Sequence, residues 1–297
     1  MKSKRNGKIL RVNLSNLSFS EEDSSKYNER FLGGRGIGAW ILFNELDIKT
    51  DPLDSNNILI FSAGALAGTN FPTSGRLNIE TKNCMTNGIN WANIGGFLGS
   101  ELGHTRWSHV VIRGKSNEPV FLYINNERVE FRDATHIWGA NVWETEDIIK
   151  SELGDPNIQI ATIGIAGEKL VPMSIIITNK TRAAGSGGVG AILGSKNLKA
   201  IAIRGTIKRD IYNPKKFEKI CRRVSSKLKK SPLTKGVKEN GNFGSSIIPA
   251  NNVCIYPYRN TQDDHYEGID NSSIAWSKWK RPQELWNACF QCPIECG

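Results

Sequence analysis

The sequence predicts an α+β protein, in which a first domain of mixed sheets with a few helices is followed by the beginning of a mostly helical domain. Short apolar runs bounded by Gly-, Pro- and Asn-containing loops recur along the first two thirds of the chain, and helical periodicity appears between only some of them. This pattern argues against strict alternation of strands and helices around one parallel sheet. The sequence pattern changes after residue 206, from short apolar runs to a basic segment and a glycine-rich stretch, so we expect domains at residues 1–206 and 207–297.

Strands of the first domain are expected wherever an apolar run has strand length. These runs lie at residues 7–14, 58–63, 76–81, 110–113, 120–124, 158–163, 174–178 and 199–204. The pair Asn125-Asn126 predicts a hairpin turn within residues 120–131. Apolar residues at helical spacing predict helices at residues 28–46, which open through a glycine cluster, and at residues 144–153.

The second domain begins with a basic segment. Residues 208–230 carry apolar side chains at helical spacing with Lys and Arg between them, which predicts an amphipathic helix. Residues 231–252 are rich in Gly, Asn, Ser and Pro and are expected to form a loop. A stretch that contains several tryptophans then leads to the terminal cysteines.

Composition and charge limit the class of protein. The 297 residues, 39% of them hydrophobic, suffice for an ordinary core, and no apolar run approaches the roughly 20 residues that span a bilayer. The first residues lack the apolar stretch of a secretory signal, so we expect a cytoplasmic protein with no membrane partner. The net charge of +10 suits an acidic electron-transfer protein or a phosphate-bearing cofactor. No nucleic acid is expected, because no nucleic-acid-binding motif accompanies the charge.

Three of the six cysteines crowd into the end of the sequence. Cys289, Cys292 and Cys296 form a C-x2-C-x3-C pattern. Each iron of a four-iron cluster usually takes one cysteine thiolate, and thiolates at this spacing on a tight loop can point inward together. Zinc accepts compact cysteine groups too and stays an alternative. Either metal needs a fourth ligand from elsewhere.

Three loops combine glycine with arginine or asparagine. They are Pro72–Arg76, Asn90–Gly96 and Arg182–Gly190. Glycines let backbone N–H groups approach an anion, arginine grips phosphate in a forked pair, and an asparagine or main-chain carbonyl can ligate magnesium. A lone glycine run is as often a tight structural turn, and a lone arginine often forms a surface ion pair. Three such loops in one domain favour a large phosphorylated ligand.

The order and spacing of these motifs resemble the aldehyde ferredoxin oxidoreductases over essentially the whole chain. The stretches that carry the resemblance are residues 7–14, 31–36, 72–76, 92–96, 136–139, 164–168, 182–190 and 194–202, with the terminal cysteines. The resemblance implies a tungsten or molybdenum bis-pterin cofactor beside a [4Fe-4S] cluster. It also implies that a small aldehyde is oxidised to a carboxylic acid and that ferredoxin accepts the electrons.

The resemblance also implies roles for individual residues. It places Arg76, Asn93, Gly95, Arg182, Ala183, Gly185 and Ser186 at the cofactor. Asn93 and the Ala183 carbonyl would lie near a magnesium ion (Mg2+) that bridges the two phosphates, and Cys289, Cys292 and Cys296 would be three of the four cluster ligands. The family commonly has arginine where this chain has Ser186, which removes one charged contact. No histidine stands in a pattern that demands a catalytic role.

Proteins of this family have longer chains, in which later helical domains complete the pterin site and supply the fourth cysteine, the acid/base residues and the substrate channel. The sequence is therefore expected to be part of a longer protein, to work with a chain that supplies the missing helical domains, or to be inactive alone. Two alternatives remain: a non-catalytic module that binds or assembles pterin or iron–sulfur groups, and a related enzyme that acts on another substrate such as an aromatic thioester.

Overall fold

The computed structural model of the protein describes residues 7–28, 30–269 and 288–296. The chain divides into a first unit, Met1–Tyr212, and a second unit, Asn213–Gly297. This division falls shortly after the boundary expected between residues 206 and 207. The mixed sheets and separate helices confirm the predicted α+β class.

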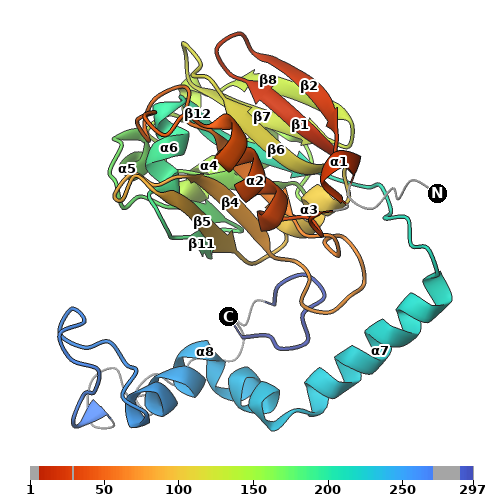
Figure 1. Ribbon diagram of the computed structural model, residues 1–297, viewed down its shortest axis with the longest axis vertical. Helices are drawn as coiled ribbons and strands as arrows, with labels where there is room; N and C mark the ends of the chain where they lie inside the picture. Colours follow the sequence, from red (N-terminus) through yellow and green to blue (C-terminus); the bar gives the residue numbers. More distant parts are fainter. Residues whose placement is uncertain (1–6, 29, 270–287, 297) are drawn as a thin grey trace. The chain divides into compact units, whose positions relative to one another are not determined.

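Two six-stranded sheets form the first unit (Figure 1). Sheet A has the order β2-β1-β6-β3-β4-β5, and its strands are β1 (Lys8–Asn13), β2 (Ser18–Asp23), β3 (Leu59–Ala63), β4 (Leu77–Lys82), β5 (Ile89–Ile94) and β6 (Trp107–Arg113). Sheet B has the order β11-β10-β9-β12-β7-β8, and its strands are β7 (Val120–Asn125), β8 (Arg128–Asp133), β9 (Gln159–Thr162), β10 (Ile176–Thr178), β11 (Arg182–Ala184) and β12 (Leu198–Arg204). Both sheets are mixed, because β1 pairs with β6 and β7 with β12 in parallel while the other pairs are antiparallel.

The main core lies between the two sheets. Successive side chains of a strand point to opposite faces, so every second residue faces this core. Leu10 and Phe61 of sheet A and Leu122 and Ile201 of sheet B belong to one buried cluster. The two sheets therefore share a single apolar interior, as in other face-to-face sheet packings.

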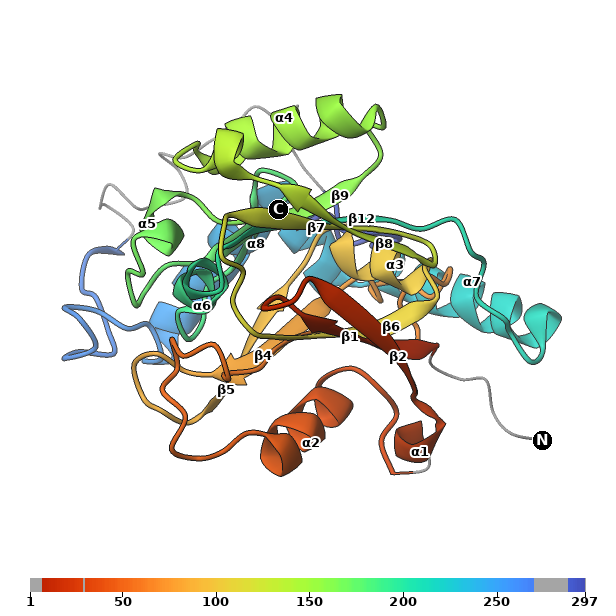
Figure 2. The ribbon, with the colours of Figure 1, turned by 90° about the horizontal axis from the view of Figure 1, so that it is seen from above.

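The helices of the first unit are α1 (Ser25–Asn28), α2 (Arg35–Glu45), α3 (Leu98–Gly103), α4 (Val142–Leu153), α5 (Ile165–Glu168) and α6 (Val189–Ser195), with a 3-10 turn at Thr135–Ile137. Helix α2 covers the outer face of sheet A and helix α4 that of sheet B, while α3 and α6 contribute buried residues to the core between the sheets (Figure 2). On sheet A, α2 packs Ile37 and Ile41 against Ile60. On sheet B, α4 packs Ile149 against Phe121. The first unit is thus layered helix, sheet, sheet, helix.

Two sequence predictions for this unit were wrong in detail. The single helix expected at residues 28–46 is interrupted, because Gly33 and Gly34 have φ values of 127° and 54° that a helix cannot continue through. The Asn90–Gly96 stretch, expected to be a loop that leads into a helix, is largely strand β5. Its Asn90, Ala92 and Ile94 are buried on one face, while Ile89, Trp91 and Asn93 are exposed on the other. The strand therefore directs the Asn93 amide outward and the Asn90 amide inward.

The second unit contains α7 (Pro214–Lys230) and α8 (Pro232–Asn252). The first confirms the predicted basic amphipathic helix. The prediction of a loop at residues 231–252 was wrong, because this segment forms α8. Pro232 is tolerated in the first helical turn, and Gly241, with φ 67°, lies at a kink between two helical segments. The tryptophan-containing stretch lies within residues 270–287, outside the described residues. Among the described helices, none has the length and apolarity needed to cross a membrane.

Candidate cofactor-binding site

The residues expected to bind the cofactor gather where the two sheets meet at their edges. Strand β5 ends sheet A, strand β11 ends sheet B, and these two strands contact each other (Figure 1). On or directly after these strands lie Asn93, Gly95, Arg182, Ala183, Gly185 and Ser186. We call this contact, residues 89–96 with residues 182–188, the seam. The fold thus brings together loops that are far apart in the sequence.

One end of the seam is fastened by Asn90. Its side-chain amide donates a hydrogen bond to the Ser186 carbonyl at 3.1 Å, and the Ser186 hydroxyl donates to Asn90 Oδ1 at 3.1 Å. Gly187 has φ 76°, and a Cβ there would lie 2.1 Å from Asn90 Nδ2. The loop after β11 is therefore held against β5 and requires glycine at 187. Sequence reasoning quoted Asn90 only as part of a loop and missed this role.

The other end of the seam positions Arg182. A Cβ on Gly96, which has φ 91°, would lie 2.5 Å from Asn179 Oδ1 and 3.2 Å from Arg182 Cγ. Asn179 Oδ1 accepts the Phe97 backbone N–H at 3.2 Å. The Arg182 side chain therefore passes directly over the backbone at the end of β5, and glycine at 96 makes this close approach possible.

Arg76 joins the site from sheet A. It directly precedes β4, and its Nε donates a hydrogen bond to Asn93 Oδ1. Asn93 Nδ2 in turn donates to Asn78 Oδ1 at 2.9 Å. Arg76 and Asn93 are both exposed, so they form one polar group on the outer face of sheet A. The Asn93 oxygen keeps a second lone pair, so it can accept from Arg76 and ligate a cation as well.

Gly185 leaves open space at the surface of the seam. Among the residues that the structure describes, a Cβ there would meet only Ile175 Cγ2, at 3.9 Å, so their packing does not require glycine. Its exposed backbone lies between Arg182 and the fastened loop. Two guanidinium groups, several amides and an open backbone are the donors that phosphate groups and a flat ring system need. The residues present therefore fit a phosphate-bearing pterin.

A buried carboxyl group lies beside the site. Glu80 of β4 stands directly opposite Trp91 of β5, on the sheet face that α2 covers. Burial raises the pKa of Glu80 to about 8, while Ser62 Oγ donates a hydrogen bond to Glu80 Oε2 at 2.7 Å. The other carboxyl oxygen, Oε1, has no hydrogen-bond partner among the described residues. Sequence reasoning did not single out Glu80, because an acidic residue in a strand gives no local signal of burial.

A second buried acid, Glu168, lies in α5 and contacts strand β12 of sheet B. Both carboxylate oxygens of Glu168 accept the Gly139 backbone N–H at 3.0 Å. Glu168 also pairs with the ammonium of Lys199, which donates to the Ala140 carbonyl at 2.8 Å. Both side chains are almost fully buried. These partners give Glu168 a structural role in joining α5, β12 and the loop at residues 139–140.

The terminal cysteines lie in the second unit. The Cys292 backbone N–H donates to the Cys289 carbonyl at 3.0 Å, which makes a tight turn. Within residues 7–28, 30–269 and 288–296, no three His, Cys, Asp or Glu side chains are gathered closely enough to hold a metal ion. The assignment of Cys289, Cys292 and Cys296 to an iron–sulfur cluster therefore stays a prediction.

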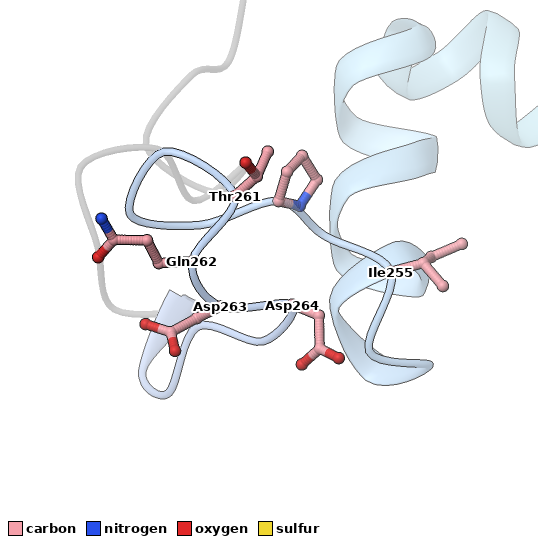
Figure 3. Close-up of a pocket in the computed structure, with 6 residues that line it drawn as sticks. Ile255, Thr261, Gln262, Asp263 and Asp264 are labelled. Carbon is pink, nitrogen blue, oxygen red and sulfur yellow. The ribbon is translucent and has the colours of Figure 1, made fainter.

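A hollow in the second unit has the wrong charge for this cofactor. It has a volume of about 410 Å³ and is lined by Ile255, Pro257, Thr261, Gln262, Asp263 and Asp264. Figure 3 shows the two carboxylate side chains extending from the same short stretch of loop. Neighbouring carboxylates repel phosphate, so this hollow does not compete with the seam as a cofactor site.

Comparisons with known proteins identify relatives of the chain. Residues 9–205 match the family model described as "Aldehyde ferredoxin oxidoreductase, N-terminal domain". The chain is 42% identical to a tungsten-containing aldehyde ferredoxin oxidoreductase of Pyrococcus abyssi, and the match covers 98% of the chain and 48% of that protein. It is 32% identical to the WOR-like subunit of an aliphatic sulfonate oxidoreductase of Pyrococcus furiosus, again over 98% of the chain and 48% of that protein.

A solved structure shares the fold. The active-site complex BamBC of benzoyl coenzyme A reductase, determined with 1,5-dienoyl-CoA, superposes with a TM-score of 0.83 at 31% identity and covers 100% of this chain and 47% of that chain. The chain thus spans about half the length of the relatives it matches. Because the family model matches well over half of its residues, the chain belongs to the aldehyde ferredoxin oxidoreductase family.

Proposed function

We propose that this chain supplies the pterin-binding part of an oxidoreductase that oxidises aldehydes to carboxylic acids and passes the electrons through a [4Fe-4S] cluster to ferredoxin. The observation that carries the proposal is the seam with Arg76 beside it: Arg76 donates a hydrogen bond to Asn93, Arg182 passes over the backbone at Gly96, and the backbone at Gly185 is open. The packing of the described part of the chain does not explain why Gly185 lacks a side chain. A bound cofactor explains it.

Arg76 and the residues of the seam would contact different parts of the cofactor. Arg76 and Arg182 would grip the phosphates, because a guanidinium offers forked, charge-assisted hydrogen bonds. Asn93 and the Ala183 carbonyl would ligate Mg2+, which prefers oxygen ligands. Gly95, Gly185 and Ser186 would offer backbone groups. The Ser186 hydroxyl donates to Asn90, so its side chain serves the seam and supplies no charge to the ligand.

The bound tungsten or molybdenum pterin would supply the chemistry, a two-electron oxidation that consumes one water and releases two protons for each aldehyde. This chain would bind the cofactor, orient it on the seam and keep its phosphates paired with cations. Cys289, Cys292 and Cys296 would hold three irons of the cluster that passes the electrons on singly. We place the reaction in the cytoplasm, where thiolates stay reduced.

Elemental analysis tests the proposal. The chain is purified anaerobically and assayed for tungsten, molybdenum, iron, zinc and magnesium, with pterin quantified by the fluorescence of its oxidised form. We expect pterin with one heavy metal, and Arg76→Ala and Arg182→Ala should each lower the pterin content. Arg128→Ala is the matched control, because Arg128 is an exposed arginine on β8, at the opposite edge of sheet B. Equal pterin in all four proteins would refute the assignment of the phosphate sites.

A related reaction is the second candidate. The likeness to the benzoyl coenzyme A reductase complex supports a thioester substrate on the same pterin-binding scaffold. We propose that substrate choice depends on the parts of the relatives that this chain does not span. Assays of the chain joined to such parts, with an aldehyde and with an aromatic thioester, separate the two. Stable pterin binding without turnover of either would favour a non-catalytic binding or assembly module.

A further inference from the structure

An exposed arginine–tryptophan pair lies beside the seam, on the same face of sheet A as Asn93. Arg35, the first residue of α2, places its guanidinium carbon 4.6 Å from the centre of the Trp91 ring. Trp91 is 51% exposed, a large value for a tryptophan on a strand. Trp91 and Asn93 are two residues apart on β5, so their side chains leave the same face of the sheet about 7 Å apart.

The stacking leaves the hydrogen-bonding edge of Arg35 available. An arginine over an aromatic ring uses its flat face, whereas its N–H donors lie in the plane of the guanidinium and point outward. Arg35 forms no ion pair with any residue within the described ranges of the chain. The ring therefore holds in place a cation that no ion pair within the described ranges neutralises.

A buried carboxyl group, that of Glu80, lies near this pair. Glu80 stands opposite Trp91 and interacts electrostatically with Arg35. Burial raises the pKa of its carboxyl to about 8, so at neutral pH the group is mostly protonated and uncharged. The carboxyl group of Glu80 lies against the backbone of Gly38 in α2, which shields it from solvent. The positive charge of Arg35 is therefore left largely uncompensated by Glu80 at neutral pH.

We propose that Arg35, held in place by Trp91, is a further anion-binding residue of the seam and receives a phosphate or another anionic group of the bound cofactor. The inference rests on the proposed function, since it extends the same site. Together with Arg76 it gives the outer face of sheet A two cations on either side of Asn93 and Trp91. Trp91 is a positioning residue, because it acts through Arg35.

Four variants test the assignment in the whole chain purified with its cofactor. Arg35→Gln removes the charge, and Arg35→Lys keeps the charge but loses the planar fork. Trp91→Leu removes the ring, and Trp91→Phe restores an aromatic face. Arg30→Gln is the matched control, because Arg30 is also exposed and also lies over a tryptophan ring, that of Trp40, at 4.1 Å. Trp40 packs against the buried cluster that contains Ile37 and Ile60.

Two readouts are measured besides activity: pterin content per chain, and affinity of the cofactor-free protein for inorganic pyrophosphate by calorimetry at two salt concentrations. We expect Arg35→Gln to bind pyrophosphate about tenfold more weakly, a change of about 1.4 kcal/mol, and to retain less pterin. Arg35→Lys and Trp91→Leu should fall between it and the wild type, and Trp91→Phe should recover most of the affinity. The difference should shrink at high salt, as expected for a charge on an exposed surface.

The outcomes separate the inference from the proposed function. If the wild type retains pterin and Arg35→Gln matches Arg30→Gln in both readouts, the role of Arg35 is wrong while the seam stands. If neither the wild type nor any variant retains pterin or binds pyrophosphate, the proposed function itself fails. Melting temperatures equal to that of the wild type show that the substituted chains are folded.

Discussion

Substitution of Gly185 by alanine separates a ligand-binding glycine from a structural one. The added methyl would meet only Ile175 Cγ2 at 3.9 Å, an ordinary van der Waals contact, and Gly185 is not among the residues with positive φ. The free energy of unfolding should therefore change by less than about 0.5 kcal/mol. In the loaded protein the methyl would occupy space that we assign to the cofactor. Overpacking of this kind costs about 1–3 kcal/mol, so cofactor affinity should fall about tenfold or more.

Gly187→Ala is the contrasting variant. Its Cβ would overlap the Asn90 side chain, at 2.1 Å from Nδ2, and its φ of 76° is unfavourable for alanine by about 1–2 kcal/mol. Breaking the two hydrogen bonds between Asn90 and Ser186 adds about 1 kcal/mol for each. This variant should lose about 3–4 kcal/mol of stability and cofactor with it.

Thermal unfolding of the cofactor-free proteins and pterin content of the loaded ones are measured side by side. The expected result is that Gly185→Ala melts like the wild type but retains little pterin, whereas Gly187→Ala is impaired in both. Full pterin retention by Gly185→Ala would refute the argument that a ligand lies against this backbone. A large loss of stability in the same variant would refute the steric argument.

The remaining predictions concern the core and the terminal cysteines. Lys199→Met should lower the free energy of unfolding by about 3–5 kcal/mol, because it leaves the buried Glu168 carboxylate unpaired, and chemical denaturation should show a smaller loss for the double variant with Glu168→Leu. Because Glu80 has a raised pKa, the folded state holds its proton more tightly than the unfolded state, so stability should fall as pH rises from its usual 4.5 to about 8. Glu80→Gln should remove about 2 kcal/mol of that fall between pH 6.5 and 8, as measured by denaturation at several pH values. His109, whose pKa is lowered to about 4 by burial, acts in the opposite direction, and stability lost between pH 6.5 and 4 should be recovered in part by His109→Gln. Cys292→Ser should remove iron while pterin content stays unchanged, and loss of both would show that the two sites depend on each other.

Sequence reasoning found most strands because their apolar residues alternate or run continuously, and it found the arginines and glycines of the seam from motif chemistry and family resemblance. It could not show that β5 and β11 meet. Their contact depends on the order of strands in two sheets, and no local pattern encodes that order. It also predicted a loop at residues 231–252, where the structure has helix α8. Each glycine destabilises a helix by only about 1 kcal/mol, so a glycine-rich composition does not by itself exclude a helix.

Asn90 and Trp91 show a further limit. Each lies in a stretch that was recognised for its other residues, and their partners are distant in the chain: Asn90 binds Ser186, and Trp91 stacks under Arg35. Burial of Glu80 depends on α2 lying over β4, which is a property of packing. Roles that arise from contacts between segments therefore became visible only in three dimensions.

The distance along the chain between the two sides of the seam has a consequence for how the protein matures. Residues 89–96 leave the ribosome long before residues 182–188, and β11 is held in sheet B by β10, which pairs with β9 and through it with the still later β12. No early folding intermediate can therefore present both halves of the seam. A cofactor that binds at the seam as proposed would therefore be loaded only after synthesis through β12.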